Sequence, residues 1–366
     1  MQFIDLKKQY SLHKNEINAE IQKVLDSGQY ILGPQVAELE KLLAEYVNVK
    51  HCLTVSSGTD SLQIALMALG IGPGDEVITV PFTFISSAQV ISLVGATPVF
   101  VDIDPETYNI NLEQLEKAIT PKTKAIMPVS LFGQMPDFNK INAIAQKHNL
   151  PVIEDGAQSF GATQNGKKSC GVSTIGSTSF FPAKPFGCYG DGGALFTNDD
   201  AIAEKMRMIR THGSIEKHHH PMFGLNGRFD TIQAAVLLAK FPHFPKEVSE
   251  RERIGARYTE LLKEVCTTPA VQMGNTHVYA QYTIRVENRE EVQERLNEKG
   301  IPSAVYYPVC VHEQPVYKHL GYQTGSFPAA EKASREVLSL PMHPWLEEKD
   351  QDTIVNTIKE SLLALA

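Results

Sequence analysis

One lysine stands out in the segment 179–197, which reads SFFPAKPFGCYGDGGALFT. Lys184 lies between two prolines, follows two aromatic residues and precedes a cluster of three glycines. A pocket lined by Phe180, Phe181 and Phe186 would desolvate the amine and favour its neutral, nucleophilic form. A lysine extending from a surface loop is the ordinary alternative, but it leaves the closely spaced glycines unexplained. The pattern indicates a reactive amine.

Two further segments carry groups that could serve the same ligand. In VSSGTDSLQIAL, Gly58 permits close backbone approach, Thr59 supplies a hydroxyl, and free N–H groups at a helix start bind phosphate. An ordinary helix N-cap after a turn explains these residues equally well. In PVIEDGAQSFGA, Asp155 ends an apolar strand, where a partly desolvated acid needs a cationic partner, and Gln158 can add an amide. An acid that caps the following loop is the alternative. Combined with Lys184, the segments indicate pyridoxal phosphate.

The elements that must position these residues alternate between strands and helices over the first two thirds of the chain. Apolar strands between amphipathic helices predict an α/β fold with a largely parallel sheet covered on both faces, and ligands then bind at the carboxyl ends of the strands. We predict strands at 52–55, 76–80, 98–103, 124–131, 151–155, 178–182 and 192–197. We predict helices at 13–28, from Pro34, at 59–69, after Phe84, and at 111–119, 137–148 and 199–213.

The alternation of apolar strands with amphipathic helices ends at about residue 245, and more highly charged helices follow. Charged helices at 249–265 and 289–300 alternate with predicted strands at 278–286 and 301–309, and a last helix ends the chain. We therefore predict two domains, a large ligand-binding domain at 1–245 and a smaller C-terminal α+β domain at 246–366.

Composition narrows the class of protein. The 366 residues are 42% hydrophobic and 21% charged with a net charge of −8, which argues against a nucleic-acid or membrane surface. The N-terminus lacks a signal-peptide pattern, and five scattered cysteines indicate neither disulfides nor a zinc site, so a cytoplasmic location is expected. The adjacent histidines 218–220 favour a solvent-facing or interface loop, because neighbouring side chains converge poorly on one ion. No metal site is predicted.

The residues and the order of the motifs resemble those of the DegT/DnrJ/StrS family of sugar aminotransferases. Members of this family have the aspartate-aminotransferase fold (fold type I of pyridoxal-phosphate enzymes). The resemblance covers essentially the whole chain. It rests on QYILGP, SSGTDSLQIAL, GDEVITVPFTFISSA, VDIDPETYNI, EDGAQSFGA, SFFPAKPFGCYGDGGA, GLNGRFDTIQAA and SLPMHPWL.

The resemblance implies a role for each matching residue. Lys184 would form the Schiff base with pyridoxal 5'-phosphate, and Asp155 would pair with the ring nitrogen. The other implied cofactor contacts are Gln158 at the ring hydroxyl, Phe84 stacked on the ring, Gly58, Thr59 and Ser179 at the phosphate, and Asn226 at the phosphate across a dimer interface. A homodimer with shared active sites is therefore expected.

Within the family, the chain is most similar to bacterial enzymes that aminate UDP-2-acetamido-2-deoxy-3-oxo-glucuronate for surface polysaccharides. The implied substrate contacts are Gly28, Tyr30, Arg228, Tyr306 and Tyr307. That subgroup often has His-Tyr-Pro where this chain has Tyr306-Tyr307-Pro308, and serine in place of Ala183.

The resemblance implies a transamination in two halves, with glutamate as amino donor and a nucleotide-linked keto sugar as acceptor, in O-antigen or lipopolysaccharide biosynthesis. An aminotransferase acting on another nucleotide-linked 3-keto or 4-keto sugar is the first alternative. Related dehydratases carry histidine in place of the lysine, so Lys184 argues against their chemistry. A non-catalytic sensor that binds pyridoxal phosphate is the remaining alternative, but this acidic chain has no basic face or added DNA-binding module.

Overall fold

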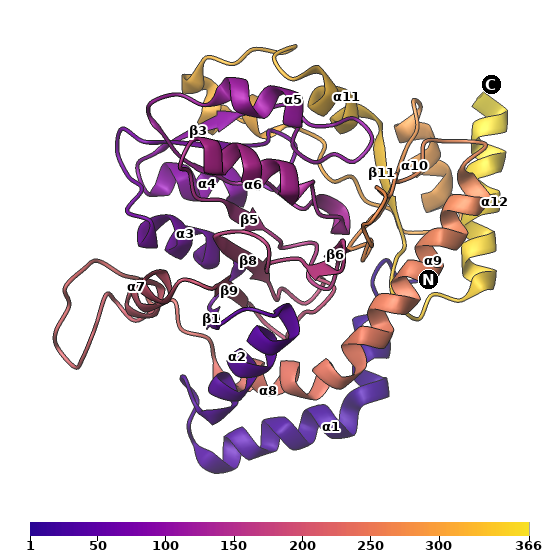
Figure 1. Cartoon of the computed structure of the whole chain (residues 1–366). Coiled ribbons are helices and arrows are strands. Elements are labelled where there is room, and N and C mark those ends of the chain that lie inside the picture. Colours follow the sequence, from indigo (N-terminus) through magenta and orange to yellow (C-terminus); the bar gives the residue numbers. More distant parts are fainter. Residues whose placement is uncertain (366) are drawn as a thin grey trace.

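This computed structural model describes residues 1–365, and a seven-stranded sheet with helices on both faces forms its centre (Figure 1). The strands are β1 (His51–Val55), β2 (Glu76–Thr79), β3 (Thr97–Phe100), β4 (Thr123–Ile126), β5 (Ile153–Asp155), β8 (Ile175–Ser179) and β9 (Gly193–Thr197). Parallel bridges from Ile126 to Val152 and from Val129 to Asp155 join the group β3-β2-β4 to the group β5-β8-β9-β1. Within this sheet β9 runs antiparallel to both neighbours and the other pairs are parallel, which confirms the predicted α/β class.

The helices begin and end where the local sequence satisfies their free backbone groups. Asp5 caps α1 (Leu6–Ser27) by accepting a hydrogen bond from the Lys8 amide, and Gly28 ends it in the left-handed conformation (φ 67°). The other helices around the sheet are α2 (Pro34–Val47), α3 (Gly58–Ala68), α4 (Ser86–Leu93), α5 (Leu112–Leu115), α6 (Phe138–Lys147), α7 (Asp200–Arg210) and α8 (Thr231–Lys240). α1 starts earlier than predicted because the stretch before residue 13 continues the helix, with a kink at His13.

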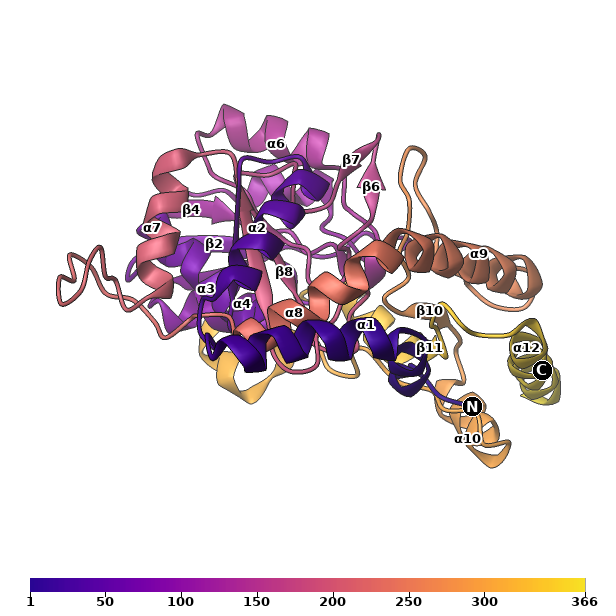
Figure 2. The ribbon, with the colours of Figure 1, turned by 90° about the horizontal axis from the view of Figure 1, so that it is seen from below.

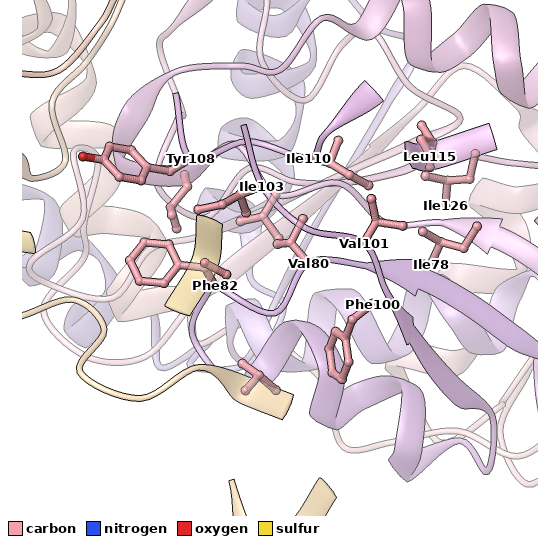
Figure 3. Close-up of a cluster of buried hydrophobic side chains, with 14 of the residues drawn as sticks. Ile78, Val80, Phe82, Phe100, Val101, Ile103, Tyr108, Ile110, Leu115 and Ile126 are labelled. Atoms are coloured by element: carbon pink, nitrogen blue, oxygen red, sulfur yellow. The ribbon is translucent and has the colours of Figure 1, made fainter. Parts of the chain in front are cut away.

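The two faces of the sheet are buried against different helices, because successive strand residues point to opposite sides. Val77 packs in a cluster with α3, α4 and α7, whereas its neighbour Ile78 packs in a second cluster with Val80, Phe100 and Ile126. Figure 3 shows part of this second cluster. Burial on both faces explains why the strands read as continuous apolar runs.

The rest of the chain forms a smaller layer beside the sheet. It comprises α9 (Phe244–Leu262), β10 (Tyr282–Arg285), α10 (Arg289–Glu298), β11 (Val337–Leu340) and α12 (Glu348–Leu365), and a hairpin of β6 (Thr163–Gln164) and β7 (Lys167–Lys168) lies near it. α11 (Pro328–Glu336) instead packs with the main sheet through Ala330 and Ala333. β10 and β11 pair antiparallel, and α9, α10 and α12 pack on them around their own apolar cluster, apart from the main sheet (Figure 2).

The predicted division into domains 1–245 and 246–366 stays a prediction. Residue 245 lies in the first turn of α9, and residue 366 lies outside the described residues. The segment after residue 245 contributes to two clusters, since Val311, Tyr317 and Phe327 pack with the sheet rather than with α9 and α12.

Two predicted strands need correction. The segment 301–309 contains an isolated bridge between Ala304 and Ser339 but no strand, because Pro302 and Pro308 have no N–H to offer to a neighbouring strand. The strand predicted at 178–182 ends at Ser179, so it includes neither Phe180 nor Phe181. None of the described helices is long and apolar enough to cross a membrane.

Candidate active site

At the carboxyl end of β1, the chain at Ser57 and Gly58 lies very close to Ser179 and Gly193. We call the hollow formed by the start of α3 and these residues the cradle. Ser57 caps α3 by accepting a hydrogen bond from the Asp60 amide at 3.0 Å, and its carbonyl accepts the Ser61 amide. In the described chain this leaves the amides of Gly58 and Thr59 without acceptors, as expected for a first helical turn. A Cβ on Gly58 would stand 2.6 Å from the Cβ of Ser179, so only glycine fits. The cradle offers N–H groups and hydroxyls of the kind that bind phosphate.

Asp155 lies buried at the carboxyl end of β5, where the parallel strands direct their ends toward the same edge. Its Oδ2 accepts a hydrogen bond from Ser87 Oγ at 2.7 Å, and its Oδ1 accepts one from the Ala157 amide at 3.2 Å. Burial raises the pKa of Asp155, while these donors and the charge of Lys184 oppose the rise. The carboxylate is therefore oriented, partly desolvated and close to a cation.

Lys184 lies in the tight loop between β8 and β9, where its amide donates to the Phe181 carbonyl at 2.9 Å. Burial lowers the pKa of Lys184, and Asp155 partly opposes this shift, so the predicted desolvation has the right direction. The predicted aromatic lining is wrong for Phe181, which is 51% exposed. Phe180 and Phe186 are buried in a cluster with α2 and α8, because β8 ends before them and the chain turns into that core.

Gln158 and the tyrosine pair connect the sheet to the 301–309 segment. Gln158 Oε1 accepts the Phe132 amide at 2.7 Å, and its Nε2 donates to Tyr307 Oη at 3.0 Å. The Tyr307 ring lies with its centroid 6.2 Å from that of Phe84, whose side chain is 55% exposed, and Tyr306 neighbours it. The structure thus brings Gln158, Phe84 and both tyrosines together.

The segments that carry Tyr30, Asn226 and Arg228 run close to one another near the carboxyl end of β1, through backbone bridges from Ile31 to Asp230 and from Val55 to Arg228. Arg228 Nε donates to Asn226 Oδ1 at 2.8 Å. The Thr231 amide donates to the Tyr30 carbonyl at 2.9 Å. Gly28 lies two residues before Tyr30, where it ends α1.

Hydroxyls at the start of α4 are site features that the sequence reasoning missed. Ser86 Oγ lies 2.9 Å from Thr59 Oγ1, and Ser87, which is buried, contacts both Asp155 and Thr83. The signal was present, since the consecutive serines of PFTFISSA follow a strand at the ligand-binding edge. Histidines 218–220 are exposed, which agrees with the prediction that they belong to a solvent-facing or interface loop.

Comparison with known proteins decides the family. Residues 11–359 match the DegT/DnrJ/EryC1/StrS aminotransferase family. The chain belongs to this family. It is 53% identical over 348 residues to the UDP-2-acetamido-2-deoxy-3-oxo-D-glucuronate aminotransferase of Pseudomonas aeruginosa, covering 95% of this chain and 96% of the relative.

Solved structures of family members share its architecture. DesV of S. venezuelae, in complex with a ketimine intermediate, matches with a TM-score of 0.97 and 39% identity, covering 99% of this chain and 98% of DesV. The Bacillus subtilis protein ntda, with bound cofactor PMP, matches with a TM-score of 0.89 and 32% identity, covering 96% of this chain and 82% of ntda. This DegT/DnrJ aminotransferase therefore has fold type I and uses pyridoxal phosphate.

The residues of the site fit that cofactor. The cradle that a Cβ on Gly58 would fill suits a phosphate, the buried and oriented Asp155 suits a protonated ring nitrogen, and the desolvated Lys184 suits an aldehyde. Gly193 is also needed, since a Cβ there would lie 2.7 Å from the Ser57 carbonyl carbon.

Proposed function

We propose that this aminotransferase transfers the amino group of glutamate to UDP-2-acetamido-2-deoxy-3-oxo-glucuronate, giving the 3-amino sugar for a bacterial surface polysaccharide. The observation that carries the proposal is 53% identity across nearly the whole length to a relative named as the aminotransferase of this keto sugar. The glutamate donor and the surface polysaccharide are proposed from the resemblance of the sequence motifs. A cytoplasmic location stays a prediction.

We assign the phosphate contacts to Gly58, Thr59 and Ser179, with Asn226 reaching the phosphate of the other subunit. The free amides and the close approach of Gly58 to Ser179 support the first three. The exposure of the Asn226 side chain supports the fourth. Gln158 is assigned to the ring hydroxyl, since one hydrogen of its Nε2 remains after the bond to Tyr307, and Phe84 to the ring face.

Pyridoxal phosphate, when bound, supplies an aldehyde that exchanges amines and a ring that withdraws electrons. Asp155 holds a proton at the ring nitrogen, because a buried carboxylate without water gains most by pairing with a cation. Ser87 and the Ala157 amide keep the carboxylate in one orientation. Lys184 would hold the cofactor, and its Nζ would accept and return a proton at the carbon that bears the amine, since burial favours its neutral form.

We assign substrate binding to Gly28, Tyr30, Arg228, Tyr306 and Tyr307. The hydrogen bond from Arg228 Nε to Asn226 leaves the two terminal nitrogens of the guanidinium for a carboxylate. Tyr306 and Tyr307 border the same edge through Gln158 and Phe84. In the proposed dimer, Arg228 reaches across the interface together with Asn226, so that Arg228 of one subunit and the tyrosine pair of the other form the site for an anionic sugar.

The purified holoenzyme should be tested with glutamate and a panel of nucleotide-linked 3-keto and 4-keto sugars. We expect glutamate to shift the cofactor's visible absorbance, and the 3-oxo-glucuronate to reverse the shift faster than its neutral counterparts do. If a neutral 3-keto or 4-keto sugar reversed the absorbance shift faster than the 3-oxo-glucuronate does, that sugar would be the preferred substrate and the proposed one would be wrong. An absorbance that glutamate does not change would overturn the proposed donor.

We propose a homodimer as the active unit. The loop 211–224 projects from the body beside α7 (Figure 1), and Ile215 and Phe223 on it are 57% and 93% exposed. Apolar side chains exposed on a projecting loop are typical of a protein–protein contact. The loop leads directly into Asn226 and Arg228, so a second copy that covers it would also meet these residues.

Mixed dimers should reveal a shared site. Combining inactive Lys184→Ala with the double variant Asn226→Ala/Arg228→Ala should restore part of the activity, because one site of each heterodimer then receives every intact residue. Activity is measured after subunit exchange has been verified with tagged chains. Exchange without any recovery would place all of these residues in one subunit.

Arg228→Ala should lower kcat/KM for the uronate by at least about 10-fold, because the substrate carboxylate loses a charge-assisted pair worth about 2–5 kcal/mol. Arg228→Lys should lose less, since lysine keeps the charge but not the planar fork. The glutamate half-reaction, followed by absorbance, should change much less. Arg207→Ala on α7 is the matched control, an arginine paired with Glu204 away from the site. Equal losses in both half-reactions would instead assign Arg228 to the cofactor or the fold.

A further inference from the structure

Four side chains with metal-binding atoms meet where α1 approaches the start of α9, away from the active site. α1 supplies His13 and Glu16, spaced i, i+3, and the 3-10 turn Phe241–His243 with the first turns of α9 supplies His243 and Glu247, spaced i, i+4. One ligand atom each of His13, Glu16 and His243 lies within 4.8 Å of the others. Figure 2 shows α1 running along α8 toward the start of α9.

The spacing of these atoms suits a coordinated ion better than direct hydrogen bonds. His13 Nδ1 lies 3.7 Å from Glu16 Oε2, and His243 Nε2 lies 3.7 Å from Glu16 Oε1. In a tetrahedral zinc site with ligands at about 2.0–2.2 Å, neighbouring ligand atoms are about 3.3–3.6 Å apart. Glu16 therefore offers one oxygen to each imidazole at nearly the separation that a shared zinc ion would impose, and the ligand atoms of the two imidazoles lie within 4.8 Å of each other.

A buried carboxylate beside the cluster supplies an independent observation. Glu247 is 7% exposed, and its Oε1 has no hydrogen-bond partner among the described residues and lies 3.7 Å from Nε2 of His13. Its other oxygen accepts from Gln9 Nε2 at 3.3 Å. A carboxylate on the second nitrogen of a histidine is the usual outer partner of a metal-ligating imidazole.

Two buried cations lie near the cluster and interact with Glu247 by charge. Each also has a hydrogen-bond partner outside the cluster, since Lys240 Nζ donates to the Gly187 carbonyl and Arg251 Nη1 donates to the Tyr279 carbonyl.

We propose that His13, Glu16 and His243 form a binding site for a divalent zinc-class ion, with Glu247 orienting His13. The two imidazoles are stacked with centroids 3.9 Å apart, so binding of the ion requires a rotation of His243, whose side chain is partly exposed. The ion ties α1 to the beginning of α9. Two histidines and one carboxylate are a known zinc ligand set, and water completes it.

The test is calorimetric titration of the holoenzyme with Zn²⁺ in a buffer that does not bind metals. We expect one site per chain, and a higher melting temperature with Zn²⁺ than without it. His13→Ala and His243→Ala should each remove this site, and Glu247→Gln should weaken it by about 10–100-fold. The matched control replaces the exposed histidines 218–220 by alanine and should keep the site.

Melting curves recorded without metal show whether each variant is folded. Should His13→Ala not fold, His243→Asn carries the test, because that position is partly exposed and asparagine retains polarity. Absence of saturable Zn²⁺ binding in the wild type would overturn the proposal. A site that survives both histidine changes, or disappears with histidines 218–220, would overturn it as well.

Discussion

Lys184→Ala is expected to reduce transamination by more than about 10³-fold, because one amine both holds the cofactor covalently and moves the proton. The variant should still bind pyridoxal phosphate through the cradle at Gly58, Thr59 and Ser179, but its absorbance should be that of the free aldehyde. Reduction of the wild-type holoenzyme with borohydride, followed by peptide mapping, should place the cofactor on Lys184.

Two controls make this result specific to Lys184. Lys167→Ala changes an exposed lysine of the β6–β7 hairpin and should leave the rate unaltered. A small primary amine added to Lys184→Ala should restore part of the proton-transfer rate, which a variant that is merely misfolded would not show. Near-normal turnover by Lys184→Ala without added amine would refute the assignment.

Asp155→Asn is expected to slow the glutamate half-reaction by about 10²–10³-fold, the effect of losing one preorganised electrostatic partner. Asparagine has nearly the same shape and can keep contact with Ser87, but it carries no charge to hold a proton at the ring nitrogen. Cofactor affinity, measured by absorbance titration, should fall less than the rate does. Stopped-flow absorbance of the half-reaction measures the loss.

Glu154→Gln is the matched control for Asp155→Asn, because the neighbouring acid on β5 is equally buried but bonded elsewhere. Its carboxylate accepts from Ser130, from Ser169 and from the Cys170 amide, and burial raises the pKa of Glu154 to about 7. We expect Glu154→Gln to lower the melting temperature with little effect on the half-reaction rate. A wild-type rate in Asp155→Asn would exclude a role at the ring nitrogen.

The metal cluster and the aromatic contacts illustrate what the sequence did not predict. The three adjacent histidines 218–220 drew attention to metal binding, yet the converging ligands His13 and His243 lie 230 positions apart, because folding places α1 on the start of α9. Phe181 seemed to line the lysine pocket because it is close in sequence, but β8 ends at Ser179 and the following turn exposes it.

The sequence by itself determined the α/β class and the positions of Lys184, Asp155 and Gly58. Strand periodicity, helix caps and glycine spacing are local properties, and the ends of parallel strands meet at one edge of a sheet. Only the tertiary structure decided that Ser87 holds Asp155 and that Tyr307 reaches Gln158 across 149 residues. Periodicity states which face of an element is buried, but the partner on that face is chosen by packing of the whole chain, which no local pattern encodes.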